Sequence, residues 1–223
     1  MSNAKKMSVE IWSDIMCPFC YIGKRKFEQA LSQFEGKEDV EIIWKSFQLS
    51  PNLVTNTAIN INEYLATHKG ISIEQAQQMN AQVSQMAKQV GLEYHLDKSV
   101  VANSFDAHRF SHYALSKGKQ LEAEEKLFQA YFTEGKNMDD KETLVSIGTT
   151  IGLEAEGVAN MLDSEDFKAE VIEDIQEAEA IGVRGVPFFV FDRKYAVSGA
   201  QEAGVFLNTL QQTLKEKQNA PIS

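Results

Sequence analysis

The strongest constraint on the fold of this chain is a long segment of helical periodicity that lies between two strand-bearing segments. Val9 to Ser13 and Val40 to Phe47 are rich in β-branched or aromatic residues, which is typical of strands, and a helical pattern behind Pro18 joins them. This order predicts a βαβ unit with parallel strands. From about residue 52 to about residue 164 apolar residues recur almost entirely at helical spacing, and so long a connection needs structure of its own.

Within this segment the start and end of one helix are especially clear. Ser72 and Gln75 form a capping-box pair, and Gly91 stands where that helix is expected to end. Further helices are expected over about residues 105–117, 121–134, 141–151 and 154–162. The sequence therefore predicts an all-helical insertion domain.

The remainder of the chain returns to mixed patterns. A helix is expected from Phe167 to Ile181, and a final one over about residues 201–217. Between them, the strand-like segments 188–191 and 195–198 flank three residues typical of a tight antiparallel hairpin. We therefore expect an α/β fold in which a discontinuous domain of residues 7–51 and 165–217 is interrupted by an all-helical insertion domain of residues 52–164.

The composition narrows the classes of partner. Of the 223 residues, 43% are hydrophobic, enough for a sizeable core, and the formal net charge of −10 disfavours nucleic acids and anionic membranes as partners. Apolar runs of only a few residues predict no transmembrane segment. The basic start of the chain lacks the apolar region of a secretion signal, so we expect a cytoplasmic protein whose thiols stay mostly reduced.

The two cysteines of the chain form a Cys17-Pro18-Phe19-Cys20 motif where a predicted strand meets a predicted helix. Unpaired N–H groups and the positive end of the helix dipole favour the thiolate form of a cysteine at that position. We expect Cys17 to be the exposed nucleophile and Cys20, one turn inside the helix, to be the resolving thiol. Pro18 fixes the first helical φ angle and so holds the two sulfurs close.

The alternative for a single CxxC motif is half of a zinc site. The chain has no second CxxC, and its histidines, His68, His95, His108 and His112, all lie in the helical segment. His108 and His112 are four residues apart and could share a helical face, but no nearby acid has ligand spacing. We therefore predict no metal and no cofactor, and interpret these two histidines as packing or groove residues.

A second motif, Gly185-Val186-Pro187, directly precedes a predicted strand. Proline at the first position of a strand can simply begin an edge strand. A cis bond before Pro187 would instead turn the Val186 backbone toward whatever lies opposite and leave its N–H and C=O free for an extended peptide. Together with the CxxC motif, this favours Pro187 as part of a redox site.

Several segments carry a resemblance to a known family. They are Ser13 to Gly23, Phe47 to Pro51, Asn103 to Arg109, Gly182 to Phe191, and Val197 to Gln201. The chain resembles the DsbA family of the thioredoxin superfamily, and most closely its cytoplasmic FrnE-like branch. The resemblance spans the chain from end to end.

This resemblance implies a thioredoxin fold interrupted by the helical domain, with catalytic Cys17, Cys20 and Pro187. Substrate would lie in a groove between Cys17, the Val186–Pro187 bond and the helical cap, in contact with Pro18, Phe19 and Val186. Asn103, His108 and Arg109 would face the same groove, although their pattern equally fits a helix cap followed by an ordinary polar face.

Two departures from related families bear on the chemistry. The Pro18-Phe19 dipeptide lacks the histidine of periplasmic DsbA proteins, which disfavours a strongly oxidising potential. Ile11 stands where many thioredoxins carry a buried acid, so neither Glu10 nor Asp14 is assigned as a proton relay, and Asp14 is expected to cap the turn.

The predicted function is thiol–disulfide exchange through a mixed disulfide on Cys17 that Cys20 resolves. The expected partners are disulfide-containing proteins or small thiols and an unidentified redox protein. The alternative is a glutathione-dependent transferase of the kappa class or a 2-hydroxychromene-2-carboxylate isomerase, which resemble this chain in fold. Those enzymes carry serine where Cys17 stands, and a charged pair where this chain has Gly199-Ala200-Gln201.

Overall fold

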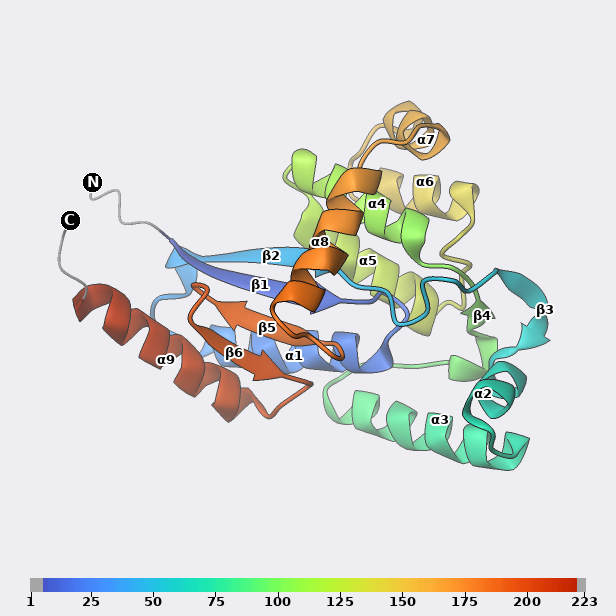
Figure 1. Cartoon of the computed structure of the whole chain (residues 1–223), viewed down its shortest axis with the longest axis horizontal. Coiled ribbons are helices and arrows are strands. Elements are labelled where there is room, and N and C mark those ends of the chain that lie inside the picture. Colours follow the sequence, from blue (N-terminus) through green and yellow to red (C-terminus); the bar gives the residue numbers. More distant parts are fainter. Residues whose placement is uncertain (1–5, 220–223) are drawn as a thin grey trace.

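A four-stranded sheet lies at one end of the molecule and a group of helices at the other (Figure 1). The computed structural model describes residues 6–219. The strands are β1 (Met7–Ser13), β2 (Val40–Ser46), β3 (Asn56–Asn60), β4 (Val100–Val101), β5 (Phe188–Phe191) and β6 (Tyr195–Ser198). The helices are α1 (Pro18–Ser32), α2 (Ile61–Lys69), α3 (Ile73–Gln89), α4 (Phe105–Ser116), α5 (Gln120–Phe132), α6 (Lys141–Thr150), α7 (Ala155–Asp163), α8 (Lys168–Ala180) and α9 (Ala203–Asn219), with short 3₁₀ turns at Lys37–Asp39 and Leu96–Lys98.

The main sheet has the strand order β2-β1-β5-β6. β1 pairs in parallel with β2, with Met7 opposite Val40 and Ser13 opposite Ser46. β5 runs antiparallel to both β1 and β6. The predicted parallel βαβ unit and the predicted hairpin are both confirmed, and this topology places the chain entering β5 beside the end of β1.

Helices cover both faces of this sheet. On one face, the buried Ile11 and Phe189 belong to the same core as Phe27 of α1 and Phe206 of α9. On the other face, Trp12 belongs to a smaller cluster with Ala178 of α8. The alternation of Ile11 and Trp12 follows from the two-residue period of a strand, so β1 is apolar on both sides and is buried at the centre of the sheet.

The segment between β2 and α8 contains α2 to α7, and each helix predicted within it is confirmed. Ser72 caps α3, its hydroxyl accepting from the N–H of Gln75, while the Gln75 side chain accepts from the N–H of Ser72. The expectation of an all-helical insertion is wrong in one detail, because β3 and β4 pair into a two-stranded antiparallel sheet. Every residue of β3 is exposed and β4 has two residues, so neither strand leaves an alternating apolar pattern in the sequence.

The side chain of Gln120, in the helical insertion, binds the backbone of the edge strand β2. The N–H of Trp44 in β2 donates to Gln120 Oε1 at 3.1 Å, and Gln120 Nε2 donates to the carbonyl of Trp44 at 3.0 Å. The Gln120 amide thus takes the place of a neighbouring strand at this point of β2 and fixes the start of α5 against the sheet.

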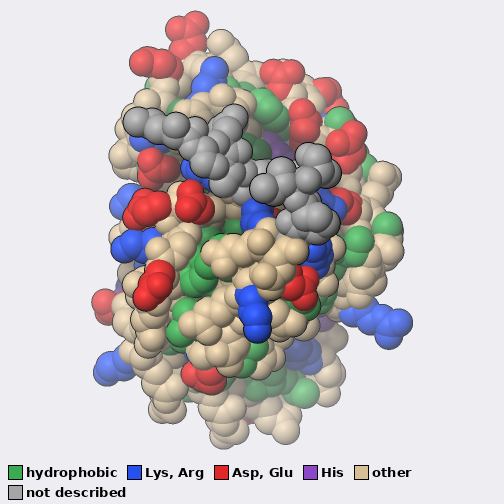
Figure 2. Space-filling view, turned by 90° about the vertical axis from the view of Figure 1, so that its left-hand side faces the viewer, with side chains coloured by type: hydrophobic (Ala, Val, Ile, Leu, Met, Phe, Trp, Pro, Cys, Tyr) green, Lys and Arg blue, Asp and Glu red, His purple; other side chains and the backbone are tan. Residues whose placement is uncertain are grey.

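The described surface carries charges of both signs. Figure 2 shows acidic and basic side chains interspersed on one face, with apolar side chains between them. Among residues 6–219, no helix is long and apolar enough to cross a membrane.

Candidate redox site

The two cysteines lie where β1 ends and α1 begins, as the motif predicts. Cys17 is the N-cap of α1 with an extended backbone (φ −89°, ψ 112°), and Pro18 is the first helical residue. No side chain caps this N-terminus, so the first N–H groups of the helix point toward the Cys17 end without a side-chain acceptor. The N–H of Cys20 donates to the carbonyl of Cys17 at 3.0 Å, and both cysteines are reduced in this structure.

Burial separates the roles of the two sulfurs. Cys17 is 4% exposed and Cys20 is 0% exposed, so the expectation that Cys17 is an exposed nucleophile is wrong in degree. Cys17 is the more accessible of the two, and the Val186 segment that lies against it accounts for its low exposure. Burial, together with the adjacent Cys17 sulfur, raises the pKa of the Cys20 thiol well above its usual range. Cys20 is therefore a protonated thiol at neutral pH.

The Val186-Pro187 segment lies against Cys17. The Val186–Pro187 peptide bond is cis, and the Cys17 thiol donates to the carbonyl of Val186 at a sulfur–oxygen distance of 3.6 Å. The carbonyl of Pro187 accepts from the N–H of Gly199 at 2.8 Å, which ties this segment to the chain leaving β6. The structure thus brings Cys17 together with Val186, although 169 positions separate them in the sequence.

Gly23 of α1 allows the close approach of this proline. A Cβ atom added to Gly23 would lie 2.9 Å from Pro187 Cγ and 3.5 Å from the Ala200 Cβ. A contact under 3.0 Å forces one of the two elements to shift. Pro187 is buried and its side chain is a ring closed on the backbone, so it cannot move aside as a flexible side chain would. Gly23 is therefore required for the packing of α1 against the segment that carries Val186.

The Gly23→Ala substitution is expected to lower the free energy of unfolding by about 1–3 kcal/mol through this overlap, even though alanine favours a helix. Gly204→Ala in α9 is the matched control, because nothing lies within 4 Å of its added Cβ. Urea unfolding of both variants measures the difference. Equal stability of the two variants would contradict the proposed contact with Pro187.

Asp14 holds the loop between β1 and α1, in agreement with its expected role as a turn cap. Its carboxylate accepts from the N–H groups of Met16 at 3.1 Å and Leu49 at 2.8 Å, and its carbonyl accepts from the N–H of Cys17 at 2.9 Å. Burial alone would raise the pKa of Asp14, but the nearby His108 imidazole and the two N–H donors outweigh it and lower that pKa. Asp14 is therefore an ionised anchor of the loop that leads to Cys17.

His108 approaches this anchor from the insertion. Its Nε2 atom lies 3.7 Å from Asp14 Oδ1, and the residue is 3% exposed. The predicted groove position of His108 is thus replaced by a buried position behind the cysteine loop. This contact with Asp14 places α4 against the turn that leads to Cys17.

Arg109 has a structural position, and the expectation that it faces the groove is not supported. It is 5% exposed, and its guanidinium donates to the carbonyls of Met161, Ser164 and Asp166 and to the Asp106 carboxylate. These carbonyls lie at and beyond the end of α7, where a helix lacks internal donors. Arg109 therefore binds the end of that helix.

Asn103 likewise joins two loops. Its Oδ1 accepts from Gln48 Nε2 and from the N–H of Phe105, and its Nδ2 donates to the carbonyls of Pro51 and Leu53. The bond from the N–H of Phe105 agrees with the alternative interpretation of Asn103 as a cap at the start of α4. Both the oxygen and the nitrogen of the Asn103 amide thus bind the segment that follows β2.

Two apolar side chains near the cysteines reach the surface. Phe19, inside the motif, is 38% exposed, and Leu49, whose N–H binds Asp14, is 52% exposed. Pro18 and Val186 are half-buried. Pro18, Phe19 and Val186 are therefore placed where a substrate chain could contact them, and their substrate-binding role stays a prediction.

Tyr94 is a site residue that the sequence does not reveal. Its hydroxyl donates to the carbonyl of Pro18 at 2.8 Å, and its ring stacks on Phe132 with a centroid distance of 4.7 Å. Burial, followed by Tyr21 and the two cysteines, raises the pKa of Tyr94, which keeps the hydroxyl protonated as a donor. No motif or periodicity surrounds Tyr94, so only the packing of the insertion identifies it.

The histidines have structural partners. His112 Nε2 donates to Asp174 Oδ2 at 2.9 Å and lies 3.2 Å from Ser46 Oγ. Within residues 6–219 no group of three or more His, Cys, Asp or Glu side chains is arranged to hold a metal. His112 thus serves the packing of α4 against α8, one of the two roles expected for it.

Comparison with known proteins identifies the relatives of this chain. The family model described as a DSBA-like thioredoxin domain matches residues 8–211. The crystal structure of a probable DsbA oxidoreductase, SCO1869 from Streptomyces coelicolor, superposes with a TM-score of 0.90 and 37% identity, covering 97% of this chain and 93% of that one. The uncharacterized protein YwbO of Bacillus subtilis is 25% identical over 212 residues, 94% of this chain and 98% of YwbO.

A more distant structure shares the fold. The cytosolic disulfide reductase DsbM of Pseudomonas aeruginosa superposes with a TM-score of 0.66 and 16% identity, covering 93% of this chain and 98% of DsbM. The 2-hydroxychromene-2-carboxylate isomerase structure gives a TM-score of 0.67 at the same identity, covering 97% and 99% of the two chains. The fold is therefore shared by redox enzymes and by an isomerase, and the chemistry depends on the residues of the site.

Proposed function

Because the chain belongs to the DSBA-like thioredoxin domain family, we propose that it exchanges disulfides with its substrates through a mixed disulfide on Cys17 that Cys20 resolves. The observation that carries this proposal is the position of two free thiols at an uncapped helix N-terminus, facing the Val186 carbonyl. Such a helix end favours a thiolate, the form of cysteine that attacks disulfides.

The exchange has two steps. The Cys17 thiolate attacks one sulfur of a substrate disulfide, a Cys17–substrate disulfide forms, and the other substrate sulfur leaves as a thiolate that takes up a proton. Cys20 then loses its proton and attacks the Cys17 sulfur, which forms the Cys17–Cys20 disulfide and releases the second substrate thiol. Two electrons pass from the protein to the substrate, and the reverse sequence oxidises a dithiol.

We propose disulfide-containing proteins or small thiols as substrates, with a separate redox protein that restores the starting form of the cysteine pair. Substrate contact at Pro18, Phe19 and Val186, the FrnE-like branch, a cytoplasmic location and an insertion domain of residues 52–164 belong to the same proposal. The partly exposed Phe19 beside Cys17 supports contact with an apolar segment of substrate.

The test is the reduction of insulin disulfides by dithiothreitol, followed by the turbidity of the precipitating B chain. The wild-type protein is expected to accelerate the reaction, and Cys17→Ser is expected to leave only the uncatalysed rate because it removes the nucleophile. A Cys17→Ser protein that retains the wild-type rate would refute the proposal.

The glutathione transferase remains the second candidate because an isomerase of similar fold exists. Conjugation of glutathione to an electrophile such as 1-chloro-2,4-dinitrobenzene does not need a resolving thiol. Fast conjugation that survives Cys20→Ser would favour the transferase, whereas slow conjugation with intact insulin reduction by the wild-type protein would favour disulfide exchange.

A further inference from the structure

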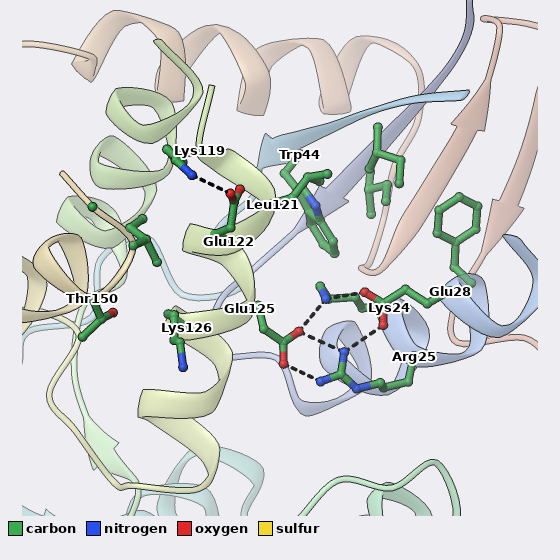
Figure 3. Close-up of a pocket in the computed structure, with 15 residues that line it drawn as sticks. Lys24, Arg25, Glu28, Trp44, Lys119, Leu121, Glu122, Glu125, Lys126 and Thr150 are labelled. Carbon is green, nitrogen blue, oxygen red and sulfur yellow. Dashed lines mark hydrogen bonds and ion pairs between the residues drawn. The ribbon is translucent and has the colours of Figure 1, made fainter. Parts of the chain in front are cut away.

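A cavity of about 730 Å³ lies between α1, β2, α5 and the end of α6, and neither cysteine lines it. Its apolar lining comes from β1, α1, β2, α5 and the residue after α6 (Figure 3), and consists of Ile11, Phe27, Ile42, Trp44, Leu121 and Ile151. Cavities of this size with a mostly apolar lining and a few polar groups are typical of small-molecule sites.

One polar group in this lining lacks a partner. Trp44 is 3% exposed, and within residues 6–219 its indole Nε1 is buried without a hydrogen-bond acceptor. Trp12 shows the ordinary arrangement, since its Nε1 donates to the carbonyl of Asp174 at 2.9 Å. A buried donor left without an acceptor costs about 1–3 kcal/mol, so the fold does not fully satisfy the cavity wall at Trp44.

Most charges around the cavity are already paired. Lys119 binds Glu122 at 2.9 Å, and Lys24 and Arg25 both bind Glu125 (Figure 3). Burial alone would raise the pKa of Glu125, but Arg25, Lys24 and Tyr21 lower it to about 2, so this carboxylate stays ionised and compensated. These carboxylates therefore leave no uncompensated negative charge to repel an anion.

Lys126 differs from the other cations of the lining. Across the described part of the chain no carboxylate lies within ion-pair distance of its ammonium group, which donates to Gln129 Oε1 at 3.0 Å. Lys126 is half-buried on α5, one turn after Glu122. An ammonium group that is hydrogen-bonded to a neutral amide and forms no ion pair is suited to bind a carboxylate.

We propose that this cavity binds a small amphipathic carboxylate, with its apolar body against Trp44, Ile42 and Phe27 and its charged end toward Lys126. Binding a hydrocarbon body against this apolar lining removes apolar surface from water, which favours binding. The Trp44 nitrogen is enclosed, and Figure 3 shows Leu121 beside that ring. Leu121 is 46% exposed, so a change of its rotamer gives the hydrocarbon body access to the indole ring.

The test uses octanoate as the probe and 1-octanol as its uncharged counterpart, added below micellar concentrations to the ¹⁵N-labelled full-length protein. The two indole N–H resonances are assigned with Trp44→Phe. Octanoate is expected to shift the Trp44 resonance saturably and leave that of Trp12 in place, because Trp12 lies on the other face of the sheet and keeps its own acceptor.

Lys126→Gln tests the charged end of the site. It is expected to weaken octanoate binding about tenfold, the loss of one charge-assisted contact, and to leave octanol binding within about twofold. Lys88→Gln, which removes the same charge from the exposed end of α3, is the control and should bind octanoate as the wild type does. Insulin reduction should be equal in both variants, since neither lysine lies in the redox site.

An unmoved Trp44 resonance at saturating octanoate would overturn the proposal, as would parallel shifts of both indoles. Equal loss of octanoate binding in Lys126→Gln and Lys88→Gln would overturn the assignment of the carboxylate end. Unchanged positions of the Trp12 resonance in every variant confirm that the fold is intact.

Discussion

Limiting iodoacetamide at neutral pH is expected to alkylate Cys17 at least about tenfold faster than Cys20 in the native protein, because each unit of pKa difference changes the thiolate fraction about tenfold. Cys20 has no exposed surface, and its burial beside the Cys17 sulfur raises its pKa, so its thiolate is scarce. Cys17 is the one of the two cysteines with some exposed surface, and it lies at the uncapped end of α1. Mass spectrometry of proteolytic peptides, with the two cysteines distinguished by fragmentation, measures the ratio.

Two controls separate this effect from the intrinsic chemistry of the peptide. In guanidinium chloride the two cysteines should react at similar rates, because the helix and the burial are lost. Cys20→Ser should be alkylated at Cys17 at a rate similar to the wild-type protein. Faster labelling of Cys20 in the native protein would reverse the assigned roles of nucleophile and resolving thiol.

Asp174→Asn is expected to lower the free energy of unfolding by about 3 kcal/mol, the lower end of the cost of breaking a buried ion pair. The Asp174 carboxylate is 3% exposed and accepts from the N–H of Ser46 at 2.8 Å, from His112 Nε2 at 2.9 Å, and from Lys45. Asparagine removes the negative charge, so Lys45 and His112 lose the carboxylate that they bind. Lys45 still binds Glu177 at 3.1 Å, which limits the loss.

The same substitution should change how stability depends on pH. Burial alone would raise the pKa of Asp174, but the hydrogen bonds from His112, Lys45 and Ser46 lower it. A group whose pKa is lower in the folded state stabilises the fold above its unfolded pKa, and that contribution is lost as the pH falls. Wild-type stability should therefore fall more steeply in acid than the stability of Asp174→Asn.

Asp163→Asn is the matched control, because the Asp163 carboxylate is 65% exposed where it binds Lys141. An exposed pair contributes about 0–1 kcal/mol. Chemical denaturation across a pH series compares the two variants. Equal losses in Asp163→Asn and Asp174→Asn would show that the buried cluster does not stabilise the packing of α8 on β2.

The central part of the site follows from short sequence patterns. A CxxC motif with proline in the first helical position has only a few local geometries, and a strand before it places Cys17 at a helix N-terminus. Gly-Val-Pro before β5 marks the second element, and the pairing of β5 with β1 brings it opposite the cysteines. Both features follow from local backbone preferences of proline and of the helix start, together with the pairing of β5 and β1.

The contacts from the insertion could not be predicted in this way. Tyr94 binds the Pro18 carbonyl across 76 positions, and its place depends on how α3 and α5 pack around the cysteine loop. Arg109 is next to His108 in the sequence, yet its side chain binds the end of α7 while His108 approaches Asp14. A one-dimensional pattern shows that the two residues are polar and adjacent, but not which partner each one finds.

The accessibility of Cys17 shows a similar limit. Its position at a helix end suggests exposure, but the Val186 carbonyl lies 3.6 Å from the sulfur and leaves it 4% exposed. Likewise, the strands β3 and β4 leave no alternating pattern, because β3 is exposed along its whole length. Burial and pairing at these places come from tertiary packing, which overrides the local signal.

The most direct test of the central claim is the capture of a mixed disulfide between insulin and the protein. Acid-quenched reactions of the reduced protein with insulin are separated without reducing agent, and the linked cysteines are identified by mass spectrometry. Cys20→Ser is expected to accumulate a covalent adduct with an insulin chain on Cys17, because the thiol that resolves it is gone. Cys17→Ser is expected to form almost none, and the wild-type protein little. An adduct on Cys20 in Cys17→Ser, with none in Cys20→Ser, would contradict the account.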